Sequence, residues 1–135
     1  MRYLLDTNIL IALLHPQRRQ QVLQHLLALP PDDVVTSAIA AHELYFGAAK
    51  SSRPEENRRR FDLLFQDLQP LEFTREDAAT AGTIRAELRA VGTPIGPYDV
   101  LMAGQAKARD LTLVTHNTRK FTRIHGLAVV DWLAG

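Results

Sequence analysis

Two patterns of apolar residues alternate along the chain. Short apolar runs, typical of buried strands, are separated by longer segments in which apolar residues recur every three or four positions, as on one face of a helix. Strands that alternate with helices favour a mostly parallel sheet that is covered by helices on both faces. The expected strands span residues 3–5, 34–36, 71–73, 111–114 and 128–130.

Capping and helix-breaking residues mark where the helices begin and end. Thr74 and Asp77 have the spacing of a capping box, with Asp in the usual place of Glu, and Gly92 is suited to end that helix. Pro54, which is followed by two glutamates, is suited to begin another helix. Further helices are expected over residues 7–14, 17–29, 38–50 and 98–109.

The composition is that of one ordinary globular domain, and we expect residues 1–135 to form it. Of the 135 residues, 46% are apolar and 23% are charged, and the absence of cysteine excludes disulfide bonds and thiolate metal sites. Sixteen basic and fifteen acidic residues give a formal charge of +1, so the total charge says little about partners. No apolar run approaches the roughly 20 residues of a membrane span, and we expect a cytoplasmic protein that does not contact a membrane.

Three carboxylates interrupt apolar segments of the chain. Asp6 directly follows the first expected strand, Glu43 lies within the apolar helix 38–50, and Asp99 follows a turn and begins the apolar segment 100–104. Asp6 should stand at the carboxyl ends of the strands, where open α/β sheets bind their ligands. A helix N-cap would also account for Asp6 and for Asp99, and a salt bridge to an arginine would account for Glu43.

If these carboxylates gather at one edge of the sheet, a divalent cation would make their mutual repulsion tolerable. Carboxylate oxygens suit Mg²⁺ and Mn²⁺, which can activate water and neutralise the charge that develops on a phosphodiester during in-line attack. Thr115 and Asn117 follow the fourth expected strand and should reach the same edge, although a strand-terminating turn would equally explain them. Asn8 would orient Asp6 by a hydrogen bond.

Four parts of the sequence together resemble the PIN-domain nucleases, and more narrowly the VapC toxins of VapBC toxin–antitoxin pairs. They are residues 4–8, Glu43 in its apolar helix, residues 96–103 and residues 114–121, and the resemblance covers essentially the whole chain. It implies a single PIN domain built as a three-layer α/β/α sandwich, with a short, mostly parallel sheet of about five strands. It also implies a Mg²⁺- or Mn²⁺-dependent endoribonuclease of a bacterium or archaeon. The implied substrate is RNA, and tRNA in particular, and the implied reaction is attack of metal-activated water on a phosphodiester.

The resemblance further implies roles for particular residues and a set of partners. Asp6, Glu43 and Asp99 fall on the family's acidic metal ligands, and Asn117 joins them as a catalytic residue. Besides RNA, the implied partners are a cognate VapB-type antitoxin that covers the site and further copies of the chain, in a homodimer or a dimer of dimers.

Lys120 departs from the family pattern, which frequently has a further acidic residue in this segment. Without that acidic residue, a second divalent metal ion is expected to bind only together with the RNA. We also expect Lys120→Glu to tighten metal binding, because it restores a carboxylate. Arg119, Lys120 and Arg123 are candidate phosphate contacts, whereas the arginine run 58–60 is more simply a solvated helix face. Tyr98 could stack on an unpaired base, with packing against the neighbouring turn as the alternative.

Two other kinds of α/β protein could also carry such carboxylates. A flavodoxin-like signalling receiver also binds Mg²⁺ through acidic groups and has nearly this length, but it needs a phosphoacceptor Asp at the end of a later strand. Here the second expected strand ends in Thr36, and Thr74 follows the third, so neither strand supplies this Asp. A second alternative is a non-catalytic metal-binding or protein-binding α/β module, which would be indicated by a folding stability that does not respond to Mg²⁺. A third is a PIN nuclease that acts on an RNA other than tRNA.

Overall fold

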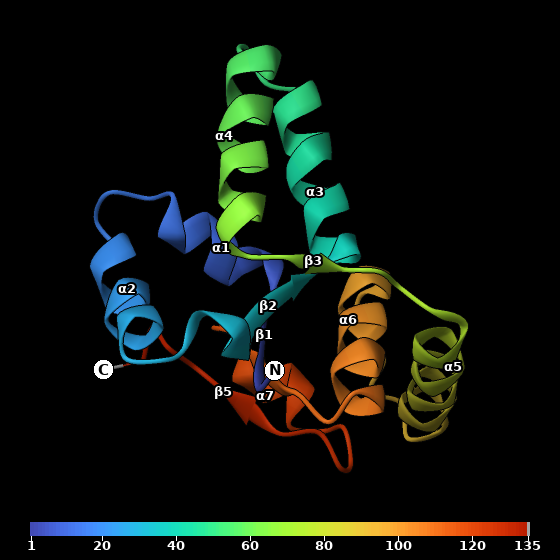
Figure 1. Ribbon diagram of the computed structural model, residues 1–135. Coiled ribbons are helices and arrows are strands. Elements are labelled where there is room, and N and C mark those ends of the chain that lie inside the picture. The colour runs from blue at the N-terminus through green and yellow to red at the C-terminus, as the bar shows by residue number, and fades with distance from the viewer. Residues whose placement is uncertain (135) are drawn as a thin grey trace.

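The protein folds around a short sheet of five parallel strands. The computed structural model describes residues 1–134, and its strands are β1 (Tyr3–Leu5), β2 (Val34–Ser37), β3 (Pro70–Leu71), β4 (Thr112–Val114) and β5 (Val129–Val130) (Figure 1). Their order across the sheet is β3-β2-β1-β4-β5, and every neighbouring pair is parallel. Flavodoxin-like receivers have the strand order 2-1-3-4-5, so the receiver alternative is wrong.

Helices connect the strands and cover both faces of the sheet. Figure 1 shows α5 and α6 on one side and α1 and α2 on the other, while α3 and α4 project together as a hairpin beyond the end of β2. Within residues 1–134, no helix has both the length and the apolar character that a membrane crossing requires. The helices are α1 (Thr7–Leu13), α2 (Arg19–Leu27), α3 (Ala38–Ala49), α4 (Pro54–Asp67), α5 (Arg75–Ala90), α6 (Pro97–Ala108), α7 (Thr118–Phe121) and the 3₁₀ helix η1 (Pro31–Asp33).

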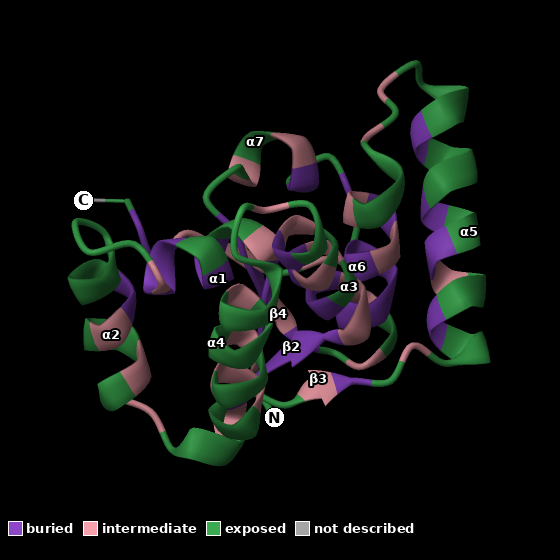
Figure 2. Ribbon diagram, turned by 90° about the horizontal axis from the view of Figure 1, so that it is seen from above, coloured by how far each residue is buried: buried purple, intermediate pink, exposed green. Residues whose placement is uncertain are grey.

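Alternate residues of the central strands contribute to two separate apolar cores. Leu5 and Val114 belong to the core that α1, α2 and the buried Trp132 line, whereas Leu4 and Leu113 belong to the core beneath α5, α6 and α7. Successive side chains of a strand point to opposite faces, so both faces of the sheet are buried. Figure 2 shows the result, with β2 buried in the middle and the outer face of α5 exposed. The expected α/β/α layers are confirmed.

Several element boundaries differ from the expectation by a few residues. β3 ends earlier than the expected strand 71–73, because the chain after Leu71 leaves the sheet for the helix cap at Thr74. α2 begins at Arg19, because residues 15–18 form a hydrogen-bonded turn before it. The short helix α7 was not predicted, since four residues are too few to show a helical period.

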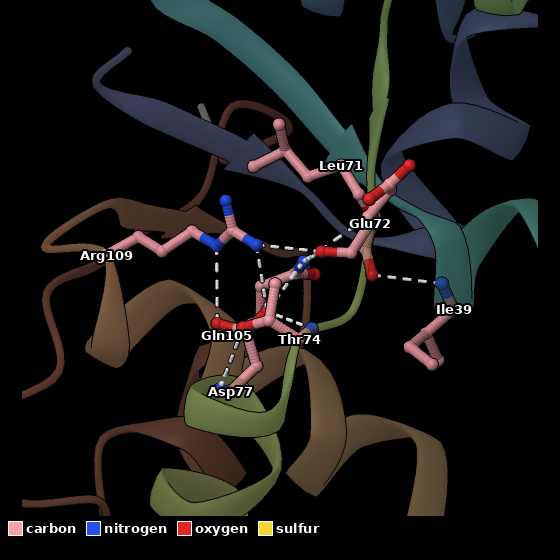
Figure 3. A network of polar contacts seen from close by, with 8 residues as sticks. Ile39, Leu71, Glu72, Thr74, Asp77, Gln105 and Arg109 are labelled. Carbon is pink, nitrogen blue, oxygen red and sulfur yellow. Dashed lines mark hydrogen bonds and ion pairs between the residues drawn. The ribbon is translucent and has the colours of Figure 1, made fainter.

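A polar network joins the start of α5 to the end of α6 (Figure 3). The predicted capping box is present, because the backbone amide of Thr74 donates to Asp77 Oδ2 (2.8 Å) and the amide of Asp77 donates to Thr74 Oγ1 (3.3 Å). The guanidinium of Arg109 donates to both carboxylate oxygens of Asp77 (3.2 and 2.9 Å) and to the carbonyl of Glu72 (2.7 Å). Gln105 donates to the same carbonyl (3.0 Å). The network fixes α6, whose other end reaches the candidate site.

Candidate functional site

Asp6 lies where the strand order reverses, between β1 and β4. In open α/β sheets, ligands bind beyond the carboxyl ends of the strands at such a point. Asp6 directly follows β1, its backbone amide donates to the carbonyl of Val114 in β4 (3.0 Å), and the residue is 3% exposed. Its Oδ1 accepts a hydrogen bond from the amide of Ile9 (3.1 Å), so Asp6 is also the N-cap of α1.

The environment of Asp6 disfavours its charged form. Burial raises the pKa of Asp6 from 3.8 to about 6, despite hydrogen bonds from Thr115 and from the backbone of Ile9 that favour the carboxylate. The negative charge of Asp99 contributes to this raised pKa, and the positive charge of Lys120 opposes it. A divalent cation beside Asp6 would stabilise the carboxylate and reverse the effect of burial.

Glu43 reaches the site from α3. Its Oε1 accepts a hydrogen bond of 2.6 Å from Oγ1 of Thr7, the residue after Asp6. In the described part of the chain no ion pair involves Glu43, so the arginine partner considered from the sequence is absent. Although its sequence is apolar, α3 is not enclosed on all sides, because it projects with α4 as a hairpin that leaves part of the helix uncovered (Figure 1). His42 is exposed, Phe46 is 59% exposed and Glu43 is half-buried.

Asp99 stands in the first turn of α6 and is paired with Lys120. The N-cap of α6 is Gly96, so the N-cap alternative for Asp99 is wrong. Asp99 Oδ2 lies 2.6 Å from Nζ of Lys120, and about a quarter of each side chain is exposed. Lys120 belongs to α7, which follows β4. Sequence reasoning placed Lys120 among the RNA contacts and missed this ion pair, because the sequence of a four-residue helix does not fix where its side chains point.

Thr115 and Asn117 both follow β4, but they lie in different surroundings. Thr115 is fully buried, bonds to the carboxylate of Asp6, and accepts a 3.1 Å hydrogen bond from the backbone amide of Asn117. Among the described residues no hydrogen bond joins Asn8 to Asp6, and it is the side chain of Thr115 that favours the Asp6 carboxylate. The exposed Asn117 lines a cavity of about 490 Å³ beside Asn8, Ile11, Arg18, His116 and Leu133.

The basic residues fall into two groups. Arg119 and Arg123 are exposed on and just after α7, next to Lys120 in the sequence. Arg58 instead pairs with Asp62 on α4 at 3.8 Å, as a solvated helix face would. The first group therefore lies on or beside α7, the helix whose Lys120 pairs with Asp99, whereas the run 58–60 lies on the projecting hairpin.

Tyr98 lies at the edge of the site, next to Asp99 in the first turn of α6. It is 44% exposed, and its ring centroid lies 5.4 Å from that of His42 on α3, with the rings tilted by 56°. Tyr98 therefore packs against a histidine across the site and still keeps part of its ring accessible.

The donor atoms of the site suit Mg²⁺ or Mn²⁺, although they do not form a ready-made cage. Asp6, Glu43 and Asp99 offer carboxylate oxygens, the ligands that these hard cations prefer. Within residues 1–134, no three side chains of Asp, Glu or His meet closely enough to hold a metal ion. Glu43 Oε1 is bound to Thr7 and Asp99 Oδ2 to Lys120, so coordination by all three carboxylates would require some rearrangement of these side chains. The residues fit such an ion in their chemistry.

The chain is similar to proteins of one family along its length. The family model described as PIN domain matches residues 3–127. The chain is 36% identical over 132 residues to the tRNA(fMet)-specific endonuclease VapC of Salmonella typhimurium, with 98% of each chain covered. It is 34% identical over 133 residues to the ribonuclease VapC2 of Haemophilus influenzae, with 98% of this chain and 99% of the other covered. The crystal structure of DNA-bound VapBC from Salmonella typhimurium matches with a TM-score of 0.91 at 36% identity, over 98% of each chain.

Proposed function

Because the chain belongs to the PIN-domain family, and within it to the VapC ribonucleases, we propose that it is a toxin that hydrolyses RNA with a divalent metal ion at the carboxyl ends of β1 and β4. PIN-domain ribonucleases generally depend on divalent metal ions. The observation that carries the proposal is the buried carboxylate of Asp6 at the reversal of the strand order, with a pKa raised by burial and by Asp99. Glu43 reaches the same region through Thr7.

Asp6, Glu43 and Asp99 are the residues that would hold Mg²⁺ or Mn²⁺. When bound, such an ion activates water and neutralises the charge that develops on the phosphodiester. The amide of Ile9 and the side chain of Thr115 hold the Asp6 carboxylate in a fixed orientation. These partners are neutral, so the negative charge of Asp6 is left available for a cation.

The substrate that we propose is RNA, and tRNA in particular. The similar protein from Salmonella typhimurium is named a tRNA(fMet)-specific endonuclease, which supports this choice. Arg119 and Arg123 are exposed and can bind phosphates, which would make RNA binding weaken as salt increases. The accessible part of the Tyr98 ring can stack on an unpaired base beside Asp99.

Three substitutions test the proposed function. Asp6→Asn, Glu43→Gln and Asp99→Asn are each expected to lower the rate of tRNA cleavage in Mg²⁺ or Mn²⁺ by about a hundredfold or more, because each removes one charged ligand. Cleavage is measured by sequencing RNA ends after incubation with the purified protein, with and without a chelator.

Asp32→Asn is the matched control for these variants. Asp32 is an exposed carboxylate in η1, at the amino end of β2 and therefore on the opposite edge of the sheet. Its loss is expected to leave cleavage unchanged. Wild-type rates in Asp6→Asn, Glu43→Gln and Asp99→Asn together would contradict the proposed site.

We also propose a cognate VapB-type antitoxin as a partner, since the similar structure from Salmonella typhimurium is a VapBC complex. An apolar groove of about 720 Å³ between α1, α2 and α4 offers a surface for it. Leu27 and Leu63, which are 83% and 58% exposed, line this groove, and Arg19 and Arg60 outweigh the single negative charge of Asp67 in its lining. Such a surface suits an amphipathic antitoxin segment that carries acidic residues.

The Leu63→Asp substitution tests this docking surface. We expect it to weaken antitoxin binding by about tenfold or more, because it places a charge in an apolar contact. Binding is measured by calorimetry with a purified VapB-type antitoxin that binds the wild type, after circular dichroism shows that the variant is folded. Val91→Asp changes an equally apolar side chain, 72% exposed at the end of α5, and should bind normally. Equal binding by the two variants would argue against the groove.

A further inference from the structure

Lys120 and Asp99 form an ion pair within the candidate metal site. Nζ of Lys120 lies 2.6 Å from Oδ2 of Asp99, with 27% and 26% of the two side chains exposed. The ammonium therefore contacts one of the two oxygens that Asp99 could offer to a divalent ion, and it places a positive charge beside the other. Lys120 is also close enough to Asp6 for its charge to favour the Asp6 carboxylate.

The other two carboxylates of the site have neutral partners in the described structure. Asp6 receives hydrogen bonds from the backbone of Ile9 and from Thr115, and Glu43 receives one from the hydroxyl of Thr7. The positive charge of the site is thus concentrated at Asp99. Three carboxylates share one ammonium, and the excess negative charge lies towards Asp6 and Glu43.

We propose that Lys120 is a built-in competitor of the divalent ion, whose ammonium neutralises Asp99 in the metal-free protein and must be displaced before Asp99 can become a ligand. The inference rests on the proposed metal site, but it does not depend on which RNA is cleaved. The ammonium repels a divalent cation nearby, and the lost ion pair offsets part of the energy of metal binding. The wild-type site is therefore expected to bind its ion more weakly than its three carboxylates would allow.

Calorimetric titration of the full chain with MnCl₂ alone tests this inference. Lys120→Met is expected to raise the affinity for Mn²⁺ by about tenfold, because it removes a unit charge from the site without adding a ligand. Lys120→Gln, a second neutral variant, should behave in the same way if the methionine variant folds poorly. Lys120→Arg keeps the charge and should retain the weak binding of the wild type.

Arg119→Met is the matched control. It removes the same charge from the neighbouring position of α7, and Arg119 is exposed and makes no ion pair among the described residues. Its affinity for Mn²⁺ should stay within about twofold of the wild type, since exposed charges are largely screened. Equal tightening in Arg119→Met and Lys120→Met would overturn the inference, because the effect would then reflect net charge and not the ion pair.

The remaining outcomes separate this inference from the proposed function. If folded Lys120→Met and Lys120→Gln bind Mn²⁺ with wild-type affinity, the inference about Lys120 is wrong. If Asp6→Asn at the same time loses Mn²⁺ binding, the proposed metal site is still supported. Absence of Mn²⁺ binding in every variant would overturn both. Nuclear magnetic resonance offers a direct view of the displacement, because the side-chain nitrogen signal of Lys120 should shift as Mg²⁺ is added. An unchanged signal in the Mg²⁺-bound protein would also overturn the inference.

Discussion

At the scale of single residues, the site combines carboxylates that are held by neutral donors with one that is held by a cation. Asp6 is almost fully buried, and its partners Ile9 and Thr115 bring no positive charge. A buried carboxylate held in this way remains unfavourable in its charged form. A divalent cation beside Asp6 would therefore stabilise its charged form, even though the side chains do not form a cage in advance.

Replacing Asp6 by Asn is expected to stabilise the metal-free protein at alkaline pH. The pKa of Asp6 is about 6 in the folded protein, above its ordinary value of 3.8. The folded protein is therefore most stable, relative to the unfolded chain, below pH 3.8, and it loses this contribution as the pH rises through 6 and Asp6 becomes charged. At about pH 8 the charged group costs up to about 3 kcal/mol of folding free energy, at roughly 1.4 kcal/mol per unit of pKa. Asn removes this cost and still serves as an N-cap. Urea unfolding in a chelating buffer measures the difference.

The same comparison at about pH 4 is the control, because Asp6 is then protonated in the folded protein. The advantage of Asn over Asp should shrink or disappear there. An Asp6→Asn protein that is less stable than the wild type at about pH 8 would contradict the electrostatic account of Asp6.

The sequence could predict the carboxylates but not their partners. Asp6, Glu43 and Asp99 each interrupt an apolar segment, which is visible without coordinates. The pairing of Asp99 with Lys120, 21 positions away, depends on how α7 packs after β4. The hydrogen bond from Thr7 to Glu43 spans 36 positions and likewise exists only in the folded chain.

At the scale of elements, the packing of α5 against α6 holds one side of the site. The network of Asp77 and Arg109 ties one end of this helix pair (Figure 3). Further along, Gly104 of α6 lies directly against Ala81 of α5, where an added Cβ would come within 2.5 Å of the Cβ of Ala81. The two helices approach this closely because glycine has no side chain, and α6 then carries Asp99 into the site.

Gly104→Ala is expected to destabilise the fold by about 1–3 kcal/mol, because the added methyl group would push α5 away from α6. Equilibrium unfolding in urea measures this change. Gly82→Ala is the matched control, since Gly82 lies in α5 with open space around its missing side chain. It should instead stabilise the protein by about 0.5–1 kcal/mol, from helix propensity. A neutral or stabilising Gly104→Ala would contradict the close packing of the two helices.

Local signals predicted some elements well and others poorly. The capping box at Thr74 lies within four residues and could be identified directly. The exposure of α3 could not, because its apolar sequence is the same whether it is enclosed or paired with α4 in a projecting hairpin. The length of α7 is below what a periodic pattern can indicate.

At the scale of the whole molecule, the order of the strands decides where the acidic residues meet. The alternation of apolar patterns predicted five parallel strands and their helical layers, because the central strands are buried on both faces and read as short apolar runs. The order β3-β2-β1-β4-β5 could not be obtained from that pattern, and it is this order that places Asp6 beside the end of β4. The groove between α1, α2 and α4 was also not predicted, since it depends on three helices at once.

Three expectations about the whole protein stay predictions. They are a single domain over residues 1–135, a cytoplasmic location, and assembly into homodimers or dimers of dimers. Sedimentation velocity of the chain with and without its antitoxin measures the last of these.

Anomalous diffraction from crystals soaked in MnCl₂ tests the central claim most directly. A divalent ion is expected beyond the carboxyl ends of β1 and β4, with oxygens of Asp6 and of Glu43 or Asp99 at about 2.0–2.2 Å from it. In such crystals Lys120 should have moved away from any Asp99 oxygen that binds the ion. An ordered site without an anomalous peak, or a peak bound to other residues, would contradict the account.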